Sequence, residues 1–155
     1  MDAYVLRRVG DHWEVLLLER AGGTRCTGAW EVVHGRIEGD ELPEAAAVRE
    51  VREETGLAIE RLYTISVQPF YLPNARTITM AVVFAAVVAD GPITLGAEHA
   101  RAAWHSFPDA VDRVTWPRSR TALGEIEVLL RAGDAGVAED VLRIGHRSSG
   151  PGHRD

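Results

Sequence analysis

The feature that most constrains this chain is the segment from residue 35 to residue 57, which reads GRIEGDELPEAAAVREVREETGL. Pro43 can open a helix, because the first helical turn has spare N–H groups and proline already holds a helical φ angle. The alanines at 45–47 are strong helix formers. Gly56 is a natural stop just past the last turn. The segment therefore predicts a helix over residues 43–55, about three turns long.

The acidic residues of this helix gather on one face. Glu50, Glu53 and Glu54 stand at positions i, i+3 and i+4, which are neighbours on a helix surface. Their mutual repulsion would destabilise a helix that had no cation, and their hard oxygen atoms suit Mg²⁺ or Mn²⁺. Spacing alone also fits a solvated acidic face, since charge runs on helices are usually surface. The side expected to face a core carries Ala47, Val48 and Val51.

The whole segment resembles the signature box of the Nudix hydrolases, enzymes that cut nucleoside diphosphates linked to another group. Gly35 is followed after five residues by Glu41, and seven more residues lead to Arg49-Glu50-Val51-Arg52-Glu53-Glu54-Thr55-Gly56-Leu57. The resemblance implies that Glu50, Glu53 and Glu54 carry the metal ions and that Arg49 orients these acids. It also implies structural roles for Gly35, Glu41 and Gly56, with Glu41 supporting the loop. The general base would be one of the box acids or a Glu outside the box.

The chain departs from the family pattern at position 34. Many members have a Gly-Gly pair here, and the carbonyl of the first Gly binds a metal ion; this chain has His34 followed by Gly35. A His carbonyl can still coordinate, so His34 stays a metal-ligand candidate, but glycine tolerates a positive φ far better than histidine. The His34 side chain could also reach a phosphate or a base, or point to solvent.

Two downstream stretches resemble the dihydroneopterin triphosphate and dATP pyrophosphohydrolase branch of the family. One runs from Glu98-His99 to Trp104, and the other is Thr115-Trp116-Pro117 with Arg120. The resemblance makes Glu98 a candidate metal ligand or catalytic base; a surface loop acid is the alternative. The catalytic candidates are therefore Glu53, Glu50, Arg49 and Glu98.

The substrate contacts are predicted from residue type and place in the chain. Arg36 and Arg76 could clamp phosphates in a bidentate manner. Aromatic side chains could stack on a base or a pterin ring, although aromatic residues also fill cores. The candidate substrate-binding residues are Arg36, His34, Arg76, Tyr71 and Trp104, with Phe70 and Trp116 as further stacking candidates.

Composition bounds the class of protein. The chain has 155 residues and a net charge of −6, which argues against a general nucleic-acid binder. The longest apolar stretch, residues 80–89, is too short to span a bilayer, and we expect neither a membrane partner nor a signal peptide. Cys26 is the only cysteine, which fits a reducing, cytoplasmic setting. We expect one domain over residues 1–144 and a disordered tail over 145–155.

The remaining pattern predicts an α/β fold. Strands are expected at residues 3–9, 13–19, 30–33, 57–71 (with a break near Gln68-Pro69), 77–89 and 102–107. Helices are expected at 108–113 and 118–131. Strands mixed with helices suggest a sandwich, and the resemblance implies a Nudix-type α/β/α sandwich with a mixed sheet between helices.

The resulting hypothesis is a Mg²⁺- or Mn²⁺-dependent pyrophosphohydrolase that converts a nucleoside triphosphate or dihydroneopterin triphosphate to a monophosphate and pyrophosphate. Other nucleoside diphosphate derivatives are the runner-up substrates: 8-oxo-dGTP, ADP-ribose or a dinucleoside polyphosphate. A non-catalytic nucleotide-sensing module is the alternative of another class. Many members of the family form dimers, so a homodimer is the one protein partner that the resemblance suggests.

Overall fold

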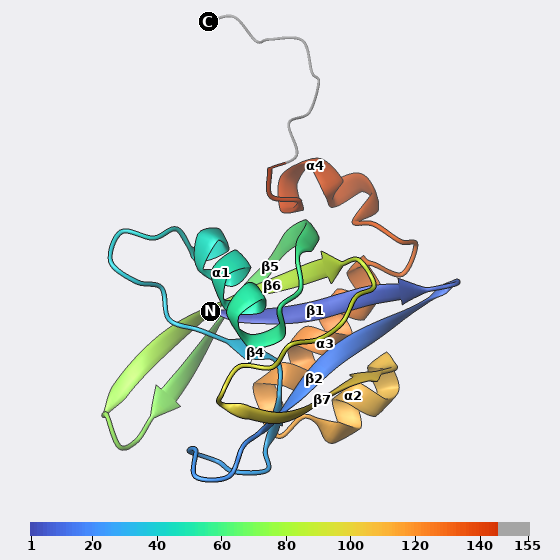
Figure 1. Ribbon diagram of the computed structural model, residues 1–155. Helices are drawn as coiled ribbons and strands as arrows, with labels where there is room; N and C mark the ends of the chain where they lie inside the picture. Colours follow the sequence, from blue (N-terminus) through green and yellow to red (C-terminus); the bar gives the residue numbers. More distant parts are fainter. Residues whose placement is uncertain (146–155) are drawn as a thin grey trace, which may run out of the picture.

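The computed structural model describes residues 1–145, which form a seven-stranded sheet with helices on both faces (Figure 1). In chain order the strands are β1 (Asp2–Val9), β2 (His12–Arg20), β3 (Trp30–Glu31), β4 (Val33–His34), β5 (Ile59–Leu72), β6 (Thr77–Val88) and β7 (His99–His105). The helices are α1 (Pro43–Thr55), α2 (Phe107–Arg113), α3 (Pro117–Leu129) and α4 (Glu139–Leu142), with a 3₁₀ turn η1 (Gly136–Ala138) before α4.

The sheet is mixed. The strand order is β3-β2-β1-β6-β5, with β4 also paired to β1 and β7 to β2. β1 and β6 run parallel, with Asp2 opposite Val83, and the other strand pairs are antiparallel. The predicted α/β sandwich, with a mixed sheet between helices, is thereby confirmed.

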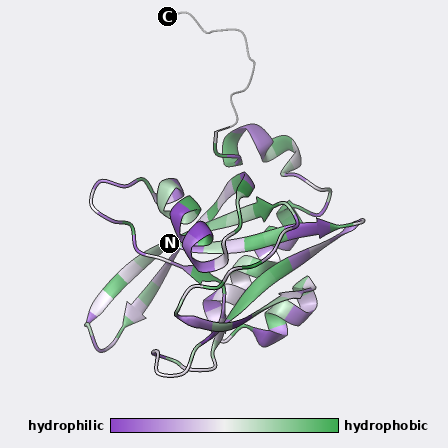
Figure 2. Cartoon of the chain, viewed as in Figure 1, coloured by the Kyte–Doolittle hydropathy of each residue, from purple (hydrophilic) through white to green (hydrophobic). Residues whose placement is uncertain are grey.

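Alternating side chains of the central strands build two cores. Ala3 and Val5 of β1 point toward α1, where they join the buried residues Ala47 and Val51. Tyr4 and Leu6 point the other way and pack with residues of α2 and α3 such as Phe107, Leu123 and Ile126. This period of two is the geometry of a strand buried on both faces. Figure 2 shows the hydrophobic colour along the central strands that separate the helical layers.

The predicted helix over residues 43–55 is confirmed to the residue as α1. Gly56 ends it in the left-handed region, with φ 73°, and its N–H donates to the carbonyl of Arg52. The expectation that Val48 faces the core is wrong, because its side chain is 47% exposed whereas Ala47 and Val51 are fully buried. Val48 lies next to the buried stripe of α1, on the side of the helix that faces solvent.

Three strand predictions are corrected by their pairing partners. β5 runs unbroken through Pro69, because β5 is an edge strand and has no outer neighbour that needs the missing N–H. The expected strand at 30–33 is two short strands, since Trp30–Glu31 pairs with β2 and Val33–His34 pairs with β1. β7 starts at His99 instead of residue 102, because its pairing with β2 begins there.

The end of the described chain carries elements that the sequence did not predict. η1 and α4 pack beside β5, where Glu139 accepts a hydrogen bond from the Tyr63 hydroxyl at 3.1 Å. The predicted disordered tail lies outside the described residues except for Gly145, and the predicted domain boundary at residue 144 stays a prediction. Within residues 1–145, no helix is both long and apolar enough to cross a membrane.

Candidate active site

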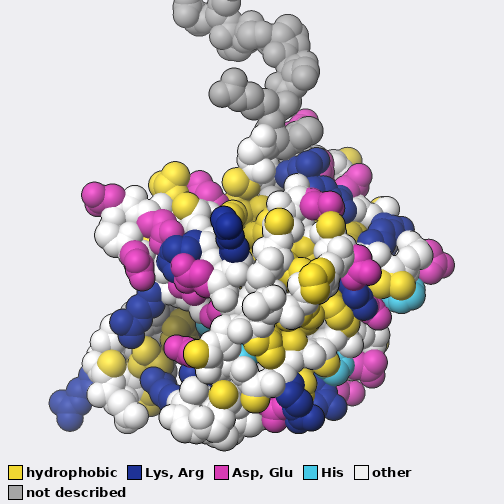
Figure 3. All heavy atoms as spheres, viewed as in Figure 1, with side chains coloured by type: hydrophobic (Ala, Val, Ile, Leu, Met, Phe, Trp, Pro, Cys, Tyr) yellow, Lys and Arg dark blue, Asp and Glu magenta, His cyan; other side chains and the backbone are white. Residues whose placement is uncertain are grey.

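Helix α1 presents its acidic face beside the loop that joins β4 to the helix. Glu50 and Glu54 are mostly covered, with side chains 14% and 18% exposed, whereas Glu53 is 59% exposed. The helical period therefore brings the three carboxylates to one face, as predicted, but at different depths. Figure 3 shows acidic and basic side chains gathered over α1 and this loop.

Arg49 is the hub of this face. Its Nε and Nη2 donate to the two carboxylate oxygens of Glu41, at 3.0 and 2.9 Å. Its Nη1 donates to Glu50 Oε1 at 2.8 Å and to Glu53 Oε2 at 3.4 Å, and its Nη2 also donates to the Arg36 carbonyl at 3.0 Å. One planar guanidinium thus joins the loop to two of the acids, which is the arrangement that the resemblance implies for Arg49 and Glu41.

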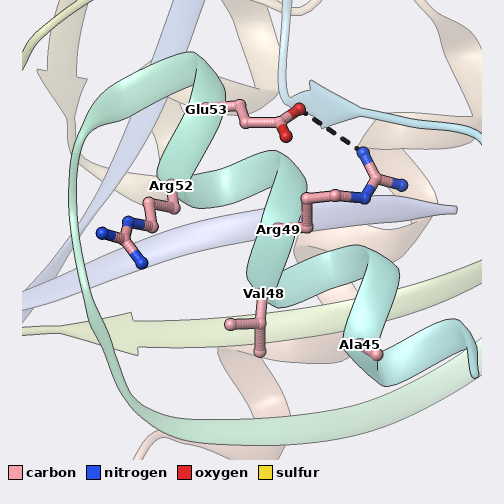
Figure 4. A pocket seen from close by; sticks show the side chains of 5 residues that line it. All are labelled: Ala45, Val48, Arg49, Arg52 and Glu53. Atoms are coloured by element: carbon pink, nitrogen blue, oxygen red, sulfur yellow. Dashed lines mark hydrogen bonds and ion pairs between the residues drawn. The ribbon is translucent and has the colours of Figure 1, made fainter.

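The outer side of α1 carries a shallow pocket lined by Ala45, Val48, Arg49, Arg52 and Glu53 (Figure 4). In this view Glu53 turns toward Arg49, and Arg52 extends away from both. The Arg52 side chain makes no hydrogen bond or ion pair among those found in residues 1–145. The two arginines of the box therefore differ: Arg49 is built into the acidic face, and Arg52 stands in solvent.

Gly35 is required by the position of Glu50. A Cβ atom at residue 35 would lie 2.2 Å from Glu50 Cγ and 2.4 Å from Glu50 Oε1, which is far inside van der Waals contact. The glycine therefore leaves a cradle that the Glu50 side chain fills. This close approach gives a physical reason for the first glycine of the box that does not depend on backbone conformation.

Glu54 lies deepest and lacks a hydrogen-bond partner for one oxygen. Its Oε2 is buried with no partner among the described residues. Burial and, after it, the negative charges of Glu50, Glu31 and Glu98 together raise the pKa of Glu54 to about 9. A buried carboxylate with no donor is costly, and a cation bound at this oxygen would offset that cost.

A second buried carboxylate, Glu31, lies behind this face and was not among the predicted site residues. Its side chain is 3% exposed and accepts hydrogen bonds from Arg20 at 2.9 Å and from Trp116 Nε1 at 3.3 Å. His99 Nε2 lies 3.4 Å from Oε1, the same oxygen that accepts from Arg20. Burial alone would raise the pKa of Glu31, but the bond to His99, the charge of His34 and the bonds to Arg20 and Trp116 outweigh it and lower this pKa to about 2.

Glu98 stands at the edge of the same group. Its side chain is 69% exposed and accepts a hydrogen bond from Arg20 Nη2 at 3.0 Å. Arg20 therefore bridges Glu31 and Glu98, and the charge of Glu98 reaches Glu54. The structure brings the predicted Glu98 near the acids of α1, and it ties Glu98 to an arginine from β2 that the sequence analysis did not single out.

His34 is held inward rather than turned to solvent. Its Nδ1 lies 2.8 Å from Asp2 Oδ1, its Nε2 lies 3.7 Å from Glu31 Oε2, and its side chain is 24% exposed. Burial lowers the pKa of His34, although the charge of Glu31 raises it. Residue 34 is not among the described non-glycine residues with positive φ, which are Cys26 and Arg76. β4 therefore accommodates His34 in ordinary strand conformation.

The other predicted substrate contacts are scattered. Arg36 is exposed in the loop before α1, and only its carbonyl contacts the acidic face. Arg76 and Tyr71 lie at the far end of the β5–β6 hairpin, where Tyr71 is 59% exposed. Trp104 is partly buried on β7 with Arg7 over its ring at 4.4 Å. The structure does not bring these four side chains together.

Two further aromatic candidates have partners of their own. Trp116 donates its indole N–H to Glu31, and Phe70 carries the Arg118 guanidinium over its ring at 4.7 Å. Arg118 in turn forms an ion pair with the buried carboxylate of Asp2. The Phe70 ring and the planar Arg118 cation thus lie together on the α3 side of the sheet.

The donor set fits a divalent cation. The buried Glu54 oxygen without a partner, the cradle that sets Glu50 and the all-oxygen chemistry of these side chains suit a hard cation such as Mg²⁺ or Mn²⁺. No three Asp, Glu, His or Cys side chains of residues 1–145 converge closely enough to enclose an ion as they stand. Glu53 is the member that is turned away, toward Arg49. The predicted ligand set stays a prediction.

Two relatives of known name match parts of the chain. A Caenorhabditis elegans protein with a nudix hydrolase name is 44% identical over 66 residues, which are 43% of this chain and 18% of that protein. A Myxococcus xanthus octanoyltransferase is 34% identical over 113 residues, which are 71% of this chain and 31% of that protein. The chain thus spans less than a third of the length of either relative.

Solved structures of low sequence identity share the fold. A Listeria monocytogenes protein described as a NUDIX hydrolase has a TM-score of 0.71 at 23% identity, over 86% of this chain and 94% of that one. The NUDIX domain of Shewanella oneidensis NrtR, complexed with ADP ribose, has a TM-score of 0.70 at 18% identity, over 83% and 85%. The Escherichia coli dihydroneopterin triphosphate pyrophosphohydrolase has a TM-score of 0.65 at 23% identity, over 82% and 94%.

The family model described as the NUDIX domain matches residues 2–124, a range that contains all seven strands, α1 and α2. It includes the box, the acidic face of α1, Glu31 and Glu98. Members of this family typically use divalent metal ions, in agreement with the donor set of the acidic face. The chain belongs to the Nudix family.

Proposed function

We propose that this chain is a divalent-metal-dependent hydrolase of a phosphoric anhydride, and that it cleaves a nucleoside triphosphate or a pterin triphosphate to a monophosphate and pyrophosphate. The observation that carries the proposal is the acidic face of α1, with its Arg49 hub and the partnerless buried oxygen of Glu54. An acidic helix face that only contacts solvent would need neither the Arg49 hub nor a buried carboxylate oxygen. Structural or binding roles leave a buried, uncompensated carboxylate unexplained.

In this proposal Glu50, Glu53 and Glu54 hold Mg²⁺ or Mn²⁺, with Glu98 and the His34 carbonyl as further ligands. When bound, such an ion neutralises phosphate charge and lowers the pKa of water. Arg49 holds Glu50 and Glu53 in place, and a carboxylate of this group takes the proton from the attacking water. Glu53 is the most accessible of the three acids, which favours it as that base.

The triphosphate assignment is supported by the two flanking stretches. Trp116 of the second stretch contacts Glu31, and Glu98 of the first contacts Arg20, so both stretches meet behind α1. ADP-ribose is the runner-up substrate, because the Shewanella domain of similar fold was solved with ADP ribose. An oxidised dNTP and a dinucleoside polyphosphate are the other runner-up substrates.

A substrate panel tests the reaction class. It should contain the dNTPs and NTPs, dihydroneopterin triphosphate, 8-oxo-dGTP, ADP-ribose and diadenosine polyphosphates, each with Mg²⁺ and with Mn²⁺. Pyrophosphate and phosphate are read separately, so the cleaved bond is identified. We expect pyrophosphate from one triphosphate well above the rest. Ligand binding without metal, and no hydrolysis with it, would instead identify a nucleotide-sensing module.

Substitution of Gly35 tests whether the cradle positions Glu50. Gly35→Ala would place a Cβ atom 2.2 Å from Glu50 Cγ, so the Glu50 side chain must swing away and give up its ion pair with Arg49. We expect metal affinity and turnover to fall about tenfold, as when other ligand-orienting contacts are lost, and the melting temperature to fall because Glu50 and Arg49 lose their ion pair. Titration calorimetry with Mn²⁺ and steady-state kinetics measure the two effects.

Gly124→Ala is the matched control for this glycine. A Cβ atom at residue 124 in α3 would meet nothing within 4 Å, and alanine in a helix is more stable than glycine by roughly 0.5–1 kcal/mol. This variant should keep full activity and melt slightly later. Equal turnover in Gly35→Ala and Gly124→Ala would show that the position of Glu50 does not matter.

A further inference from the structure

The imidazole ring of His99 lies between two carboxylates from different elements. His99 opens β7, and its side chain is 2% exposed. Its Nε2 lies 3.4 Å from Oε1 of Glu31 on β3, and its Nδ1 lies 3.9 Å from Oε2 of Glu54 on α1. The ring therefore connects the buried acid behind the site with the deepest acid of the predicted metal face.

The hydrogen positions on this ring follow from its partners. An ionised carboxylate can only accept hydrogen bonds, so Nε2 carries the hydrogen that points to Glu31. In the neutral ring this leaves Nδ1 as a lone pair directed at Glu54. Nδ1 and Glu54 Oε2 are both buried and both lack a hydrogen-bond partner among the described residues.

The gap between these two atoms suits a bound cation. A distance of 3.9 Å is too long for a direct hydrogen bond, so the two atoms do not satisfy each other, and a cation bound between them would contact both. Histidines that bind metal ions almost always donate their other ring N–H to a carboxylate or a carbonyl group, which fixes the tautomer and the ring orientation. Glu31 stands in that place behind His99.

We propose that Nδ1 of His99 is a metal ligand together with Glu54, and that this nitrogen makes the site favour a divalent transition-metal ion over Mg²⁺. The inference rests on the proposed function, because it assumes that Glu54 binds metal. Mg²⁺ prefers oxygen ligands and keeps much of its water, whereas transition-metal ions accept imidazole readily. His99 thereby sets which cation the enzyme uses.

The other buried histidine of the site does not offer the same geometry. His34 Nε2 is also without a hydrogen-bond partner, but it faces Glu31 Oε2 at 3.7 Å. That Glu31 oxygen already accepts the indole N–H of Trp116. His99 faces an oxygen with no donor, and His34 faces one that is already paired, so the proposal is limited to His99.

Pulsed electron paramagnetic resonance on the Mn²⁺-loaded protein tests this ligand directly. Mn²⁺ is paramagnetic, and a directly bound imidazole nitrogen adds a nuclear modulation to its echo. We expect this modulation in the unaltered protein, with its frequency changed when the protein is grown with ¹⁵N-labelled histidine. An echo from bound Mn²⁺ without any nitrogen modulation overturns the proposal, and it would assign the gap to a bridging water.

A variant pair assigns the nitrogen to one residue. His99→Gln keeps an amide N–H for Glu31 but removes the imidazole, so the modulation should vanish and Mn²⁺ affinity should fall about 10- to 100-fold, with Mg²⁺ affinity nearly unchanged. His105→Gln is the control, because His105 lies on the same strand against Trp30, at 5.8 Å between ring centroids. An unchanged modulation in His99→Gln overturns the assignment.

Failure of the proposed function would look different. If Glu54→Gln binds Mn²⁺ as tightly as the unaltered protein, and no triphosphate is hydrolysed, the metal face itself is wrong and the His99 inference falls with it. If metal-dependent hydrolysis is present and depends on Glu54, but bound Mn²⁺ shows no nitrogen modulation, only the His99 inference is overturned.

Discussion

Replacing Glu54 by glutamine is expected to lower turnover by roughly 10²–10⁴-fold, because a bound metal ion contributes several kcal/mol of transition-state stabilisation and about 1.4 kcal/mol is tenfold in rate. Glutamine has the same shape but cannot carry the charge that the proposed metal site needs. The buried Oε2 of Glu54 has no protein donor to lose, so we expect the fold to be unharmed. Steady-state kinetics with Mg²⁺ and with Mn²⁺, together with melting curves, measure both effects.

The pH dependence of stability gives this variant a second signature. In metal-free protein the pKa of Glu54 is raised to about 9 from its ordinary value of 4.5. Ionisation is then easier in the unfolded chain, so Glu54 costs the folded state more as pH rises from about 4.5 to about 9. Glu54→Gln should therefore melt later than the unaltered protein in EDTA, by a margin that grows over this pH range.

The control for Glu54 is another glutamate nearby in the chain. Glu60 is exposed on β5, and Glu60→Gln should change neither turnover nor the pH profile of stability. If Glu54→Gln keeps near-normal turnover with both metal ions, the assignment of Glu54 to the metal site is wrong.

Replacing Arg49 by alanine is expected to lower turnover by about 10²-fold, the size of effect that a misplaced catalytic group produces. The substitution frees Glu50 and Glu53 and releases the loop at Glu41 and the Arg36 carbonyl. Metal affinity should weaken in parallel, and the melting temperature should fall because Glu41 and Glu50 lose their partner. Arg49→Lys should restore little, since an ammonium cannot reproduce the forked contacts of a guanidinium.

Arg52→Ala is the matched control, because Arg52 lies one turn further along the same helix and points away from the acids (Figure 4). It should retain turnover and metal affinity. If Arg49→Ala and Arg52→Ala behave alike in kinetics and in metal titration, Arg49 has no special part in placing the acids.

The local sequence was enough to predict α1, because every signal acts within a few residues. Pro43 at the start, the alanine run and Gly56 at the end all point to the same helix, and the helix matches it to the residue. Val48 was misplaced because a helix wheel does not say how wide its buried stripe is. The bounds of β7 and the split between β3 and β4 depend on which strands lie alongside, which is a property of the whole sheet.

The candidate site divides in the same way. The acids of α1 and their arginine lie on one helix and a short loop, so spacing alone brought them together. Glu31, Arg20 and His99 come from three strands, and the bonds between them span from 11 to 68 residues of sequence. A buried Glu in a strand has no local signal that separates it from a solvent-facing one, so these residues could be found only in the folded chain.

The parallel pairing of β1 with β6 affects the order in which this sheet can fold during synthesis. Asp2 pairs with Val83 and Leu6 with Val87, so the middle of the sheet joins the two ends of a chain segment more than eighty residues long. Contacts so distant in sequence are slow to form, because the entropy cost of closing a long loop comes before the favourable contact energy. On the ribosome, the β1–β2 hairpin is the first piece of this sheet that can close on itself, but the inner edge of β1 has no strand partner until β6 has been made.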